Sequence, residues 1–402
     1  MGGKSFWAMK QIKNILLITK EFQSEFQGNV GGTGVFYKNI SEGLIDRGIN
    51  VFVFGSAKKP FDIQKEKLSV HFVKDYFKKY FLMELLRSVT GKISFLEKLH
   101  YKIYDSEAKY LEKELSKFIA DKNIDIIETH DWEGISRIAK GLKIPYVIRC
   151  HGSWSVLNRF FGYGAAKGKI YSEKKAFENA ENIITVSQSS QKMVREIFGN
   201  KDYHLIYNGI DTDFYQPQNS EKISKSIFFI GNISTEKGAD TALNVFIKVH
   251  EREPATTLHF IGKDTELTEQ LKRKIAENQI ESKVIFYGKK NRNDVKDLLS
   301  KADVIIFPSR GETFGLALIE AMALEKPVVC SNLEVFSEII TEGMNGLIAQ
   351  NEIEFSEKIS ELFSDKNSAL NLSQNARKTV VEKFSLDQMI GKTLHYYQKI
   401  SS

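Results

Sequence analysis

Short apolar runs of strand length alternate with helical patterns along the chain. In the second half these runs are residues 227–230, 258–261, 284–287, 304–307 and 327–330. Continuous apolar runs of this length are typical of strands buried on both faces, as in parallel sheets. The first half begins in the same way, with a run at 14–19, a helical pattern and a second run at 51–54. The alternation predicts an α/β protein whose parallel sheets carry helices on both faces.

The length and composition limit the class of protein. At 402 residues the chain is too long for one core and suits two domains. Of its residues, 42% are hydrophobic and 27% are charged. These values are typical of a soluble globular protein, and a net charge of +6 does not by itself indicate a nucleic-acid partner.

The same sequence indicates a cytoplasmic protein. Cys150 and Cys330 each close an apparent buried strand in a different half, so we expect reduced thiols and no disulfide between them. No apolar run is long enough to span a bilayer, and residues 1–10 lack the apolar core of a secretory signal.

The segment 308–320 is the strongest candidate site. It follows the buried run at 304–307, and the spacing of the apolar residues after it predicts a helix that opens at 314–316. Gly315 permits a close backbone approach, and the amides and dipole at such a helix start favour an anion. Glu312 lies on the loop at the carboxyl end of the strand, and Glu320 follows about two helical turns later. Two carboxylates therefore bracket one anion-binding helix start.

A second strand-to-helix turn in the same half carries a cation. Residues 231–238 follow the run at 227–230, and Lys237 stands at the expected helix start, where an ammonium can meet a diphosphate.

The first half offers two histidines and a glycine-rich turn. His130 and His151 each stand at the carboxyl end of a predicted strand, where parallel sheets bind ligands. Gly28, Gly31, Gly32 and Gly34 lie in the first strand-to-helix turn, which suits a phosphate or a close ligand approach but equally a plain tight turn. Their spacing is not that of a dinucleotide-binding fingerprint.

Together these motifs resemble the retaining glycosyltransferases of family four, which have the GT-B fold. The resemblance is strong at Lys237 and in 308–322, where Ala321-Met322-Ala323 follows Glu320, and moderate at His151 and at 31–34; it is absent from 56–122. It implies two Rossmann-like, doubly wound parallel-sheet domains facing across a cleft. The expected boundaries are 1–207 for an acceptor-side domain with a helical insert at about 74–122, and 208–383 for a donor-binding domain. A final helix at 384–402 is expected to cross back to the first domain.

The resemblance also implies roles for individual residues. Glu312 would face the donor sugar, Glu320 would accept hydrogen bonds from the ribose, and His151 would face the donor sugar from the first domain. His130 would lie on the acceptor side. Further residues expected at the donor are Gly31, Gly32, Gly34, Gly262, Arg310, Thr313, Phe314, Gly315 and Leu316. The family usually has an arginine where this chain has Asn232, so one fixed charge at the diphosphate is missing, and Arg310 or Lys263 could compensate.

The implied activity is transfer of a sugar from a nucleotide-diphosphate sugar to a saccharide or lipid-linked acceptor in cell-surface glycan synthesis, with retention. Negative charge that builds on the leaving diphosphate would be stabilised by Lys237 and by the amides of Phe314, Gly315 and Leu316. No aspartate-pair metal motif is evident, so we expect a metal-independent hexosyltransferase without a cofactor. The alternatives are a nucleotide-sugar epimerase or phosphorylase-type enzyme of the same fold, or a catalytically silent nucleotide-binding scaffold.

Residues 74–102 differ in character from the rest of the chain. They combine seven basic and three acidic residues with many aromatic and aliphatic side chains. This composition suits docking on an anionic membrane surface, which would place the protein at the inner face of the cell membrane. The alternative is an amphipathic helical pair packed on the domain edge with its lysines solvated.

Overall fold

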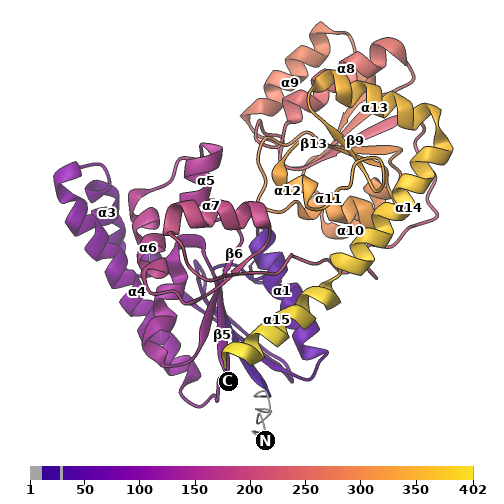
Figure 1. The fold of residues 1–402 in the computed structure, drawn as a ribbon. Coiled ribbons are helices and arrows are strands. Elements are labelled where there is room, and N and C mark those ends of the chain that lie inside the picture. Colours follow the sequence, from indigo (N-terminus) through magenta and orange to yellow (C-terminus); the bar gives the residue numbers. More distant parts are fainter. Residues whose placement is uncertain (1–10, 28–29, 402) are drawn as a thin grey trace, which may run out of the picture. The chain divides into compact units, whose positions relative to one another are not determined.

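The computed structural model describes residues 11–27 and 30–401, and its chain divides into two compact units (Figure 1). The first unit comprises the residues up to Tyr207 together with those from Met389 onward, and the second comprises Asn208–Gln388. Each unit is built around a mainly parallel sheet, which confirms the predicted α/β architecture.

The sheet of the first unit has the strand order β3-β4-β2-β1-β5-β6-β7-β8, and its neighbours are parallel except for the antiparallel pair β3 and β4. Buried isoleucine, leucine and valine side chains in the central strands form its core, as the apolar runs predict. The strands are β1 (Asn14–Ile18), β2 (Asn50–Ala57), β3 (Phe61–Gln64), β4 (Leu68–Lys74), β5 (Ile126–His130), β6 (Tyr146–Cys150), β7 (Asn182–Thr185) and β8 (Tyr203–Leu205).

Helices cover both faces of this sheet, with α4 and α6 on one side and α1 and α15 on the other (Figure 1). Helices α2, α3 and α4 lie within residues 74–122, where the sequence predicts a helical insert. The helices are α1 (Gly32–Ile45), α2 (Tyr76–Lys79), α3 (Phe81–Thr90), α4 (Glu97–Ile119), α5 (Trp154–Phe161), α6 (Lys167–Glu178), α7 (Gln188–Phe198) and α15 (Leu386–Ile400), with 3-10 segments η1 (Ser94–Leu96) and η2 (Trp132–Leu142).

The last helix is joined to the first unit by a buried polar cluster. Arg149 on β6 is fully buried and donates two hydrogen bonds, of 2.9 and 2.8 Å, to the Glu128 carboxylate on β5. It also donates to Thr393 on α15 at 3.0 Å, and the Tyr397 hydroxyl of the same helix donates to Glu128. Because a buried charge is stable only when it is paired, this cluster ties α15 to the centre of the sheet.

The sheet of the second unit is parallel, with the strand order β11-β10-β9-β12-β13-β14. The helices α8, α9 and α13 pack on one side, in a cluster that the start of α14 joins, and α10 and α11 lie on the other (Figure 1). The strands are β9 (Ser226–Ile230), β10 (Thr257–Ile261), β11 (Val284–Phe286), β12 (Val304–Phe307), β13 (Val328–Ser331) and β14 (Leu347–Ala349). The helices are α8 (Ala239–Arg252), α9 (Glu266–Glu277), α10 (Arg292–Ser300), α11 (Leu316–Ala323), α12 (Glu334–Ser337), α13 (Glu352–Ser364) and α14 (Lys366–Lys383), with the 3-10 segment η3 (Glu281–Lys283).

Two further expectations concern the cysteines and the membrane. Cys150 and Cys330 are both buried free thiols, which confirms that no disulfide joins them. Among the described residues, no helix has the length and apolar character that crossing a bilayer requires.

Candidate functional site

The candidate site of the second unit lies where its strand order reverses. Strand β9, the first strand of this sheet along the sequence, pairs with β10 on one side and with β12 on the other, and Ile227 lies opposite Val304. In an open parallel sheet, this reversal leaves a crevice at the carboxyl ends of the two strands, where ligands bind. The loops 231–238 and 308–315 follow β9 and β12, so the fold brings the two predicted anion-binding turns together.

The side chains of Lys237 and Glu312 form an ion pair at this edge. The Lys237 Nζ lies 2.6 Å from Oε1 of Glu312, and the Ser309 hydroxyl donates to the same oxygen at 3.2 Å. The Lys237 side chain is one-third exposed and that of Glu312 is 15% exposed, so both can reach a ligand. Two residues that the sequence predicted separately are therefore in direct contact.

Arg310 ties the two loops to each other. Its amide donates to the Glu236 carbonyl at 2.8 Å, and its guanidinium donates to the Thr235 carbonyl at 3.0 Å and to Asp240 at 2.7 Å. Because Asp240 already neutralises this guanidinium, Arg310 is poorly placed to replace the charge missing at Asn232, whose own side chain is exposed.

Gly262 allows a close approach of two strand ends. A Cβ atom at this position would lie 1.7 Å from the carbonyl oxygen of Gly231, a distance that no side chain tolerates. The glycine therefore lets the loop after β10 pack directly against the loop that carries Lys237.

The start of α11 has the geometry of an anion site. Gly315 precedes the helix with φ at +103°, a conformation that favours glycine, so the helix begins at Leu316 as the sequence predicts. The amides of Leu316 and Ala317 belong to the first turn, where no helical carbonyl precedes them to accept a hydrogen bond. Phe314 is buried against Phe384, with ring centroids 6.0 Å apart, so only its main chain can serve a ligand. The first turn of α11 and Lys237 thus offer a helix dipole and a cation at the same sheet edge.

Glu320 lies in a partly buried setting that the sequence did not indicate. Burial raises the pKa of its carboxyl group to about 7, although a hydrogen bond from the Tyr215 hydroxyl and the charge of Arg292 oppose the shift. Arg292 in turn donates to the Tyr215 hydroxyl at 3.4 Å and lies over the Phe214 ring at 4.0 Å from its centroid. Tyr215 and Arg292 lie 105 and 28 residues from Glu320 in the sequence, so no local spacing could have linked them to it.

This pKa shift predicts a pH-dependent stability. Between pH 4.5, the ordinary value for a glutamate, and about pH 7, the folded protein keeps a proton that the unfolded chain has released. Stability therefore falls as the pH rises through this window. Glu320→Gln cannot ionise, so its unfolding free energy should not fall in this way. We expect the difference in unfolding free energy between this variant and the wild type to grow by at most about 3 kcal/mol, in favour of the variant, as the pH rises from 4.5 to about 7. Urea unfolding at both ends tests this, with the exposed Glu357→Gln as a control; an equal gain in both variants would contradict the assignment.

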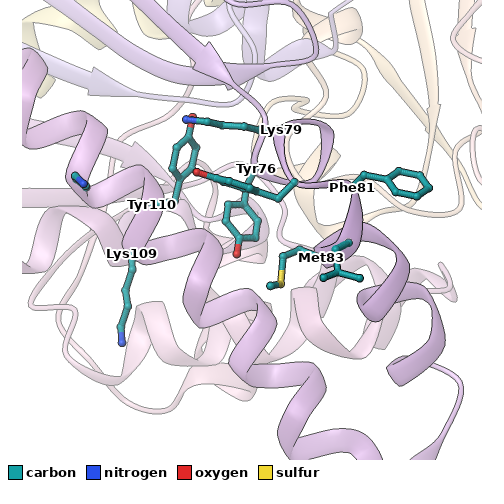
Figure 2. Close-up of a pocket in the computed structure, with 9 residues that line it drawn as sticks. Tyr76, Lys79, Phe81, Met83, Lys109 and Tyr110 are labelled. Carbon is teal, nitrogen blue, oxygen red and sulfur yellow. The ribbon is translucent and has the colours of Figure 1, made fainter.

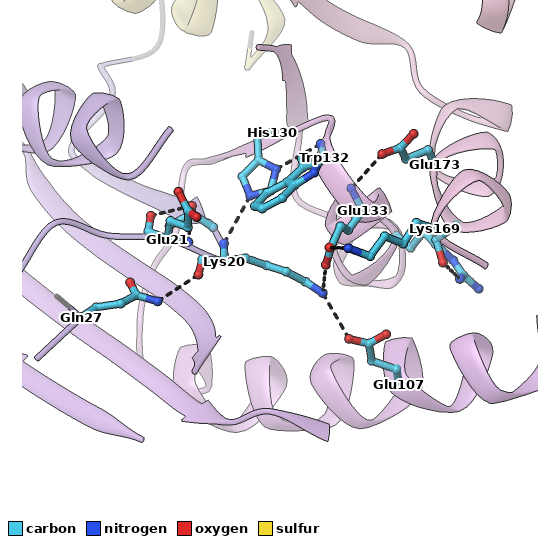
Figure 3. A network of polar contacts seen from close by, with 12 residues as sticks. Lys20, Glu21, Gln27, Glu107, His130, Trp132, Glu133, Lys169 and Glu173 are labelled. Carbon is cyan, nitrogen blue, oxygen red and sulfur yellow. Dashed lines mark hydrogen bonds and ion pairs between the residues drawn. The ribbon is translucent and has the colours of Figure 1, made fainter. Parts of the chain in front are cut away.

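In the first unit, the predicted histidines lie at the carboxyl ends of neighbouring strands, but in different environments. His130 is fully buried; its Nε2 lies 3.2 Å from the Lys20 amide and its Nδ1 lies 3.1 Å from the Trp132 amide (Figure 3). Burial first, and then the charge of Lys20, lower the pKa of His130 to about 3. A neutral imidazole enclosed in this way suits a structural role, and contact with an acceptor stays a prediction.

His151 differs from His130 in the hydrogen bonding of its ring. Its Nε2 is buried and has no hydrogen-bond partner among the described residues, while its ring packs at 4.4 Å from that of Phe36 on α1. Burial, followed by the nearby Arg149 charge, holds the pKa of His151 well below its ordinary value, so the ring is neutral. An unpaired neutral imidazole nitrogen can hydrogen-bond a hydroxyl group, and contact of His151 with the donor sugar stays a prediction.

Asp131 fixes the turn that carries His151. Its two carboxylate oxygens accept hydrogen bonds from the amides of His151 and Gly152, at 3.0 and 3.2 Å. Burial, reinforced by the nearby Glu173 charge, raises the pKa of Asp131 to about 7. The position of His151 therefore depends on a buried carboxyl group that sequence spacing did not single out.

A charged network adjoins these loops (Figure 3). Lys20, two residues after the end of β1, lies 3.2 Å from Glu107 on α4 and 2.7 Å from Glu133, and Lys169 pairs with Glu133 at 2.5 Å. Burial opposes ionisation of Glu133, but the two lysines outweigh it and hold the pKa of this carboxyl at about 2. Lys20 follows the apolar run at 14–19 directly, a signal that could have identified it as a residue of the ligand-binding edge.

The glycine-rich turn is partly described. Gly31 precedes α1 and its amide donates to the Glu21 carboxylate at 2.8 Å, so a side chain of the protein already meets this helix start. Gly32 opens the helix, Gly34 lies within its first turn, and Gly28 is outside the described residues. Binding of a phosphate by this turn stays a prediction.

A metal centre is not evident in the parts of the chain that the structure describes. Within residues 11–27 and 30–401, no group of three or more histidine, cysteine, aspartate or glutamate side chains is arranged to hold a metal ion.

Comparisons with known proteins agree with this architecture. Residues 211–379 match the family model of glycosyl transferases group 1, and residues 30–214 match that of glycosyltransferase family 4. An uncharacterised glycosyltransferase of Methanocaldococcus jannaschii is 29% identical over 314 residues, which cover 72% of this chain and 79% of that protein.

Two solved structures share the fold. The sucrose-phosphate synthase of Thermosynechococcus elongatus superposes with a TM-score of 0.73 at 17% identity, covering 96% of this chain and 98% of that one. Anabaena HepE, in complex with UDP-glucose, gives a TM-score of 0.68 at 18% identity, covering 95% and 99%. The two family matches together span residues 30–379, and with the shared GT-B fold they support a group 1 glycosyltransferase.

Proposed function

We propose that the protein transfers a sugar from a nucleoside-diphosphate sugar to a saccharide or lipid-linked acceptor, with retention of the anomeric configuration and without a metal ion. The observation that carries this proposal is the contact between Lys237 and Glu312 beside the first turn of α11. A nucleotide sugar has a diphosphate, which needs positive charge, next to hydroxyl groups, which need a hydrogen-bond acceptor. The two side chains supply one of each.

Donor binding would redistribute the charge of Lys237. In the structure Glu312 neutralises this ammonium at 2.6 Å. A diphosphate carries more negative charge than a carboxylate, so it would compete for Lys237 and leave Glu312 to accept hydrogen bonds from the sugar hydroxyls. The amides of Leu316 and Ala317 would hold the phosphates from the other side.

The proposed reaction is a same-face substitution. The bond between the anomeric carbon and the diphosphate oxygen breaks, and the acceptor oxygen attacks from the side that the diphosphate leaves. The acceptor proton passes to a diphosphate oxygen. Negative charge grows on the leaving group in the transition state, and the preorganised ammonium and amides lower the barrier by stabilising it.

Anabaena HepE supports the choice of donor, because it has been solved with UDP and with UDP-glucose. UDP sugars are therefore the first donors to test, followed by GDP and ADP sugars.

A product analysis tests the proposal. The protein is incubated with each nucleotide sugar and candidate acceptors, and nucleoside diphosphate release is followed while NMR identifies the anomer formed. We expect release of the nucleoside diphosphate together with a product whose new glycosidic linkage has the same anomeric configuration, axial or equatorial, as the donor. Conversion of the donor sugar without release would instead indicate an epimerase, a sugar 1-phosphate formed from added phosphate would indicate a phosphorylase, and binding without any product would indicate a silent scaffold.

A further inference from the structure

Helix α3 and the residues after it expose an unusual number of apolar side chains. Of the thirteen most exposed large apolar residues in the described part of the chain, seven lie between Tyr80 and Leu99. Phe81 is 79% and Phe95 is 86% exposed. We call this surface the α3 ridge, and it consists of Phe81, Leu82, Leu85, Val89, Phe95 and Leu99.

The ridge is not the face by which α3 packs on its own unit. Met83 and Leu86 point inward and pack against a cluster of Tyr76, Phe77 and Ile103. Phe81, Leu85 and Val89 recur every four residues and therefore form a separate stripe on the exposed side. Glu84 and Arg87 neutralise each other at 2.7 Å, so this helix adds no net charge of its own to the stripe. A helix that is apolar on two faces normally has a second apolar environment.

A groove opens beside the ridge (Figure 2). It has a volume of about 720 Å³ and lies between the start of α3 and helix α4. Aromatic rings and a methionine form most of its wall, and lysines line it as well. The residues that matter here are Tyr76, Lys79, Phe81, Met83, Lys109 and Tyr110.

The charge around the ridge and groove is positive. Lys78, Lys92, Lys98 and Lys102 are exposed at the two ends of the ridge. In the groove, the Lys79 ammonium lies 4.5 Å from the centroid of the Tyr110 ring. Between residues 74 and 102, seven basic residues outnumber three acidic ones. This surface therefore complements an anionic partner, and it would repel a second copy of itself.

We propose that the α3 ridge and the adjoining groove dock the protein on an anionic lipid bilayer. The apolar side chains enter the boundary between headgroups and acyl chains, the lysines beside them contact lipid phosphates, and the groove accepts one lipid between its rings and lysines. Apolar insertion combined with basic residues is the recognised chemistry of peripheral membrane binding. This proposal goes beyond the transfer reaction, because vesicle binding requires no sugar donor.

Vesicle sedimentation with the full chain tests the proposal. We expect binding to vesicles of phosphatidylcholine mixed with phosphatidylglycerol at low salt, little binding to phosphatidylcholine alone, and release as the salt concentration rises. The variant Phe81→Ser/Phe95→Ser is expected to bind at least about tenfold more weakly. Ile353→Ser/Leu370→Ser is the matched control, because both residues are exposed apolar side chains in the second unit, and it is expected to bind as the wild type does.

A second pair of variants tests the contribution of positive charge to vesicle binding. Lys92→Glu/Lys98→Glu is expected to lose binding to the anionic vesicles, whereas Lys378→Glu/Lys392→Glu, at exposed positions outside the ridge, is expected to keep it. Absence of wild-type binding at low salt, or equal binding by the ridge and control variants, would overturn the proposal. So would a dimer in sedimentation velocity that Phe81→Ser/Phe95→Ser abolishes, without vesicle binding, because the ridge would then cover a second copy. Donor turnover measured on the same preparations is independent of these results, so failure here leaves the proposed transfer standing.

Discussion

Replacement of Lys237 by alanine is expected to lower turnover about a thousandfold while the protein stays folded. The ammonium lies 2.6 Å from Glu312 and beside the first turn of α11, where the leaving diphosphate is proposed to bind. Its removal takes away the fixed positive charge that stabilises the transition state, and it leaves the Glu312 carboxylate to repel the phosphates. The ion pair is partly exposed, so its loss should cost less than about 1 kcal/mol of stability.

An assay of nucleoside diphosphate release measures turnover, and thermal unfolding measures stability. Lys272→Ala is a matched control, because Lys272 also forms an ion pair in the second unit, with Glu269 at 2.8 Å. This control should retain wild-type turnover. Near-normal turnover of Lys237→Ala with a bound donor would show that the leaving group is stabilised elsewhere.

Glu312→Ala is expected to separate catalysis from nucleotide binding. Without the carboxylate, the sugar hydroxyls lose their acceptor, and turnover should fall by about two to three orders of magnitude. The free Lys237 ammonium no longer has an internal partner, so a nucleoside diphosphate without a sugar should bind as tightly as to the wild type or more tightly.

Calorimetry with UDP and a turnover assay on the same variant test this pair of effects. Glu269→Ala removes a carboxylate from the Lys272 ion pair and is expected to change neither quantity. Weaker binding of the nucleoside diphosphate to Glu312→Ala would contradict the proposed competition between the carboxylate and the diphosphate.

The sequence could predict the local part of the second-unit site. An apolar run followed by a glycine-containing turn and a helical pattern defines a strand-to-helix turn, and the structure has such turns at 231–238 and 308–315. The sequence could not show that β9 and β12 are neighbours, which is what places Lys237 against Glu312, a residue 75 positions further along the chain. Pairing of two strands so far apart in the sequence depends on the packing of the whole sheet.

The parts that sequence missed depend on long-range contacts in the same way. Strands β3 and β4 extend the first sheet in a region where no familiar motif occurs, although the alternating burial of Leu68–Lys74 is typical of a half-buried strand. Lys20 meets Glu107 and Glu133 over 87 and 113 positions. His130 shows the limit most clearly: its place at a strand end was predicted, but the complete burial of its ring and the contacts of its two nitrogens with the Lys20 and Trp132 amides follow from the folded loops.

The most direct measurement is a crystal structure of the protein with a bound nucleotide sugar. The account predicts that the diphosphate oxygens lie within hydrogen-bonding distance of the Lys237 ammonium and of the Leu316 and Ala317 amides, with the sugar hydroxyls on Glu312. Phosphates bound away from the first turn of α11 would contradict it.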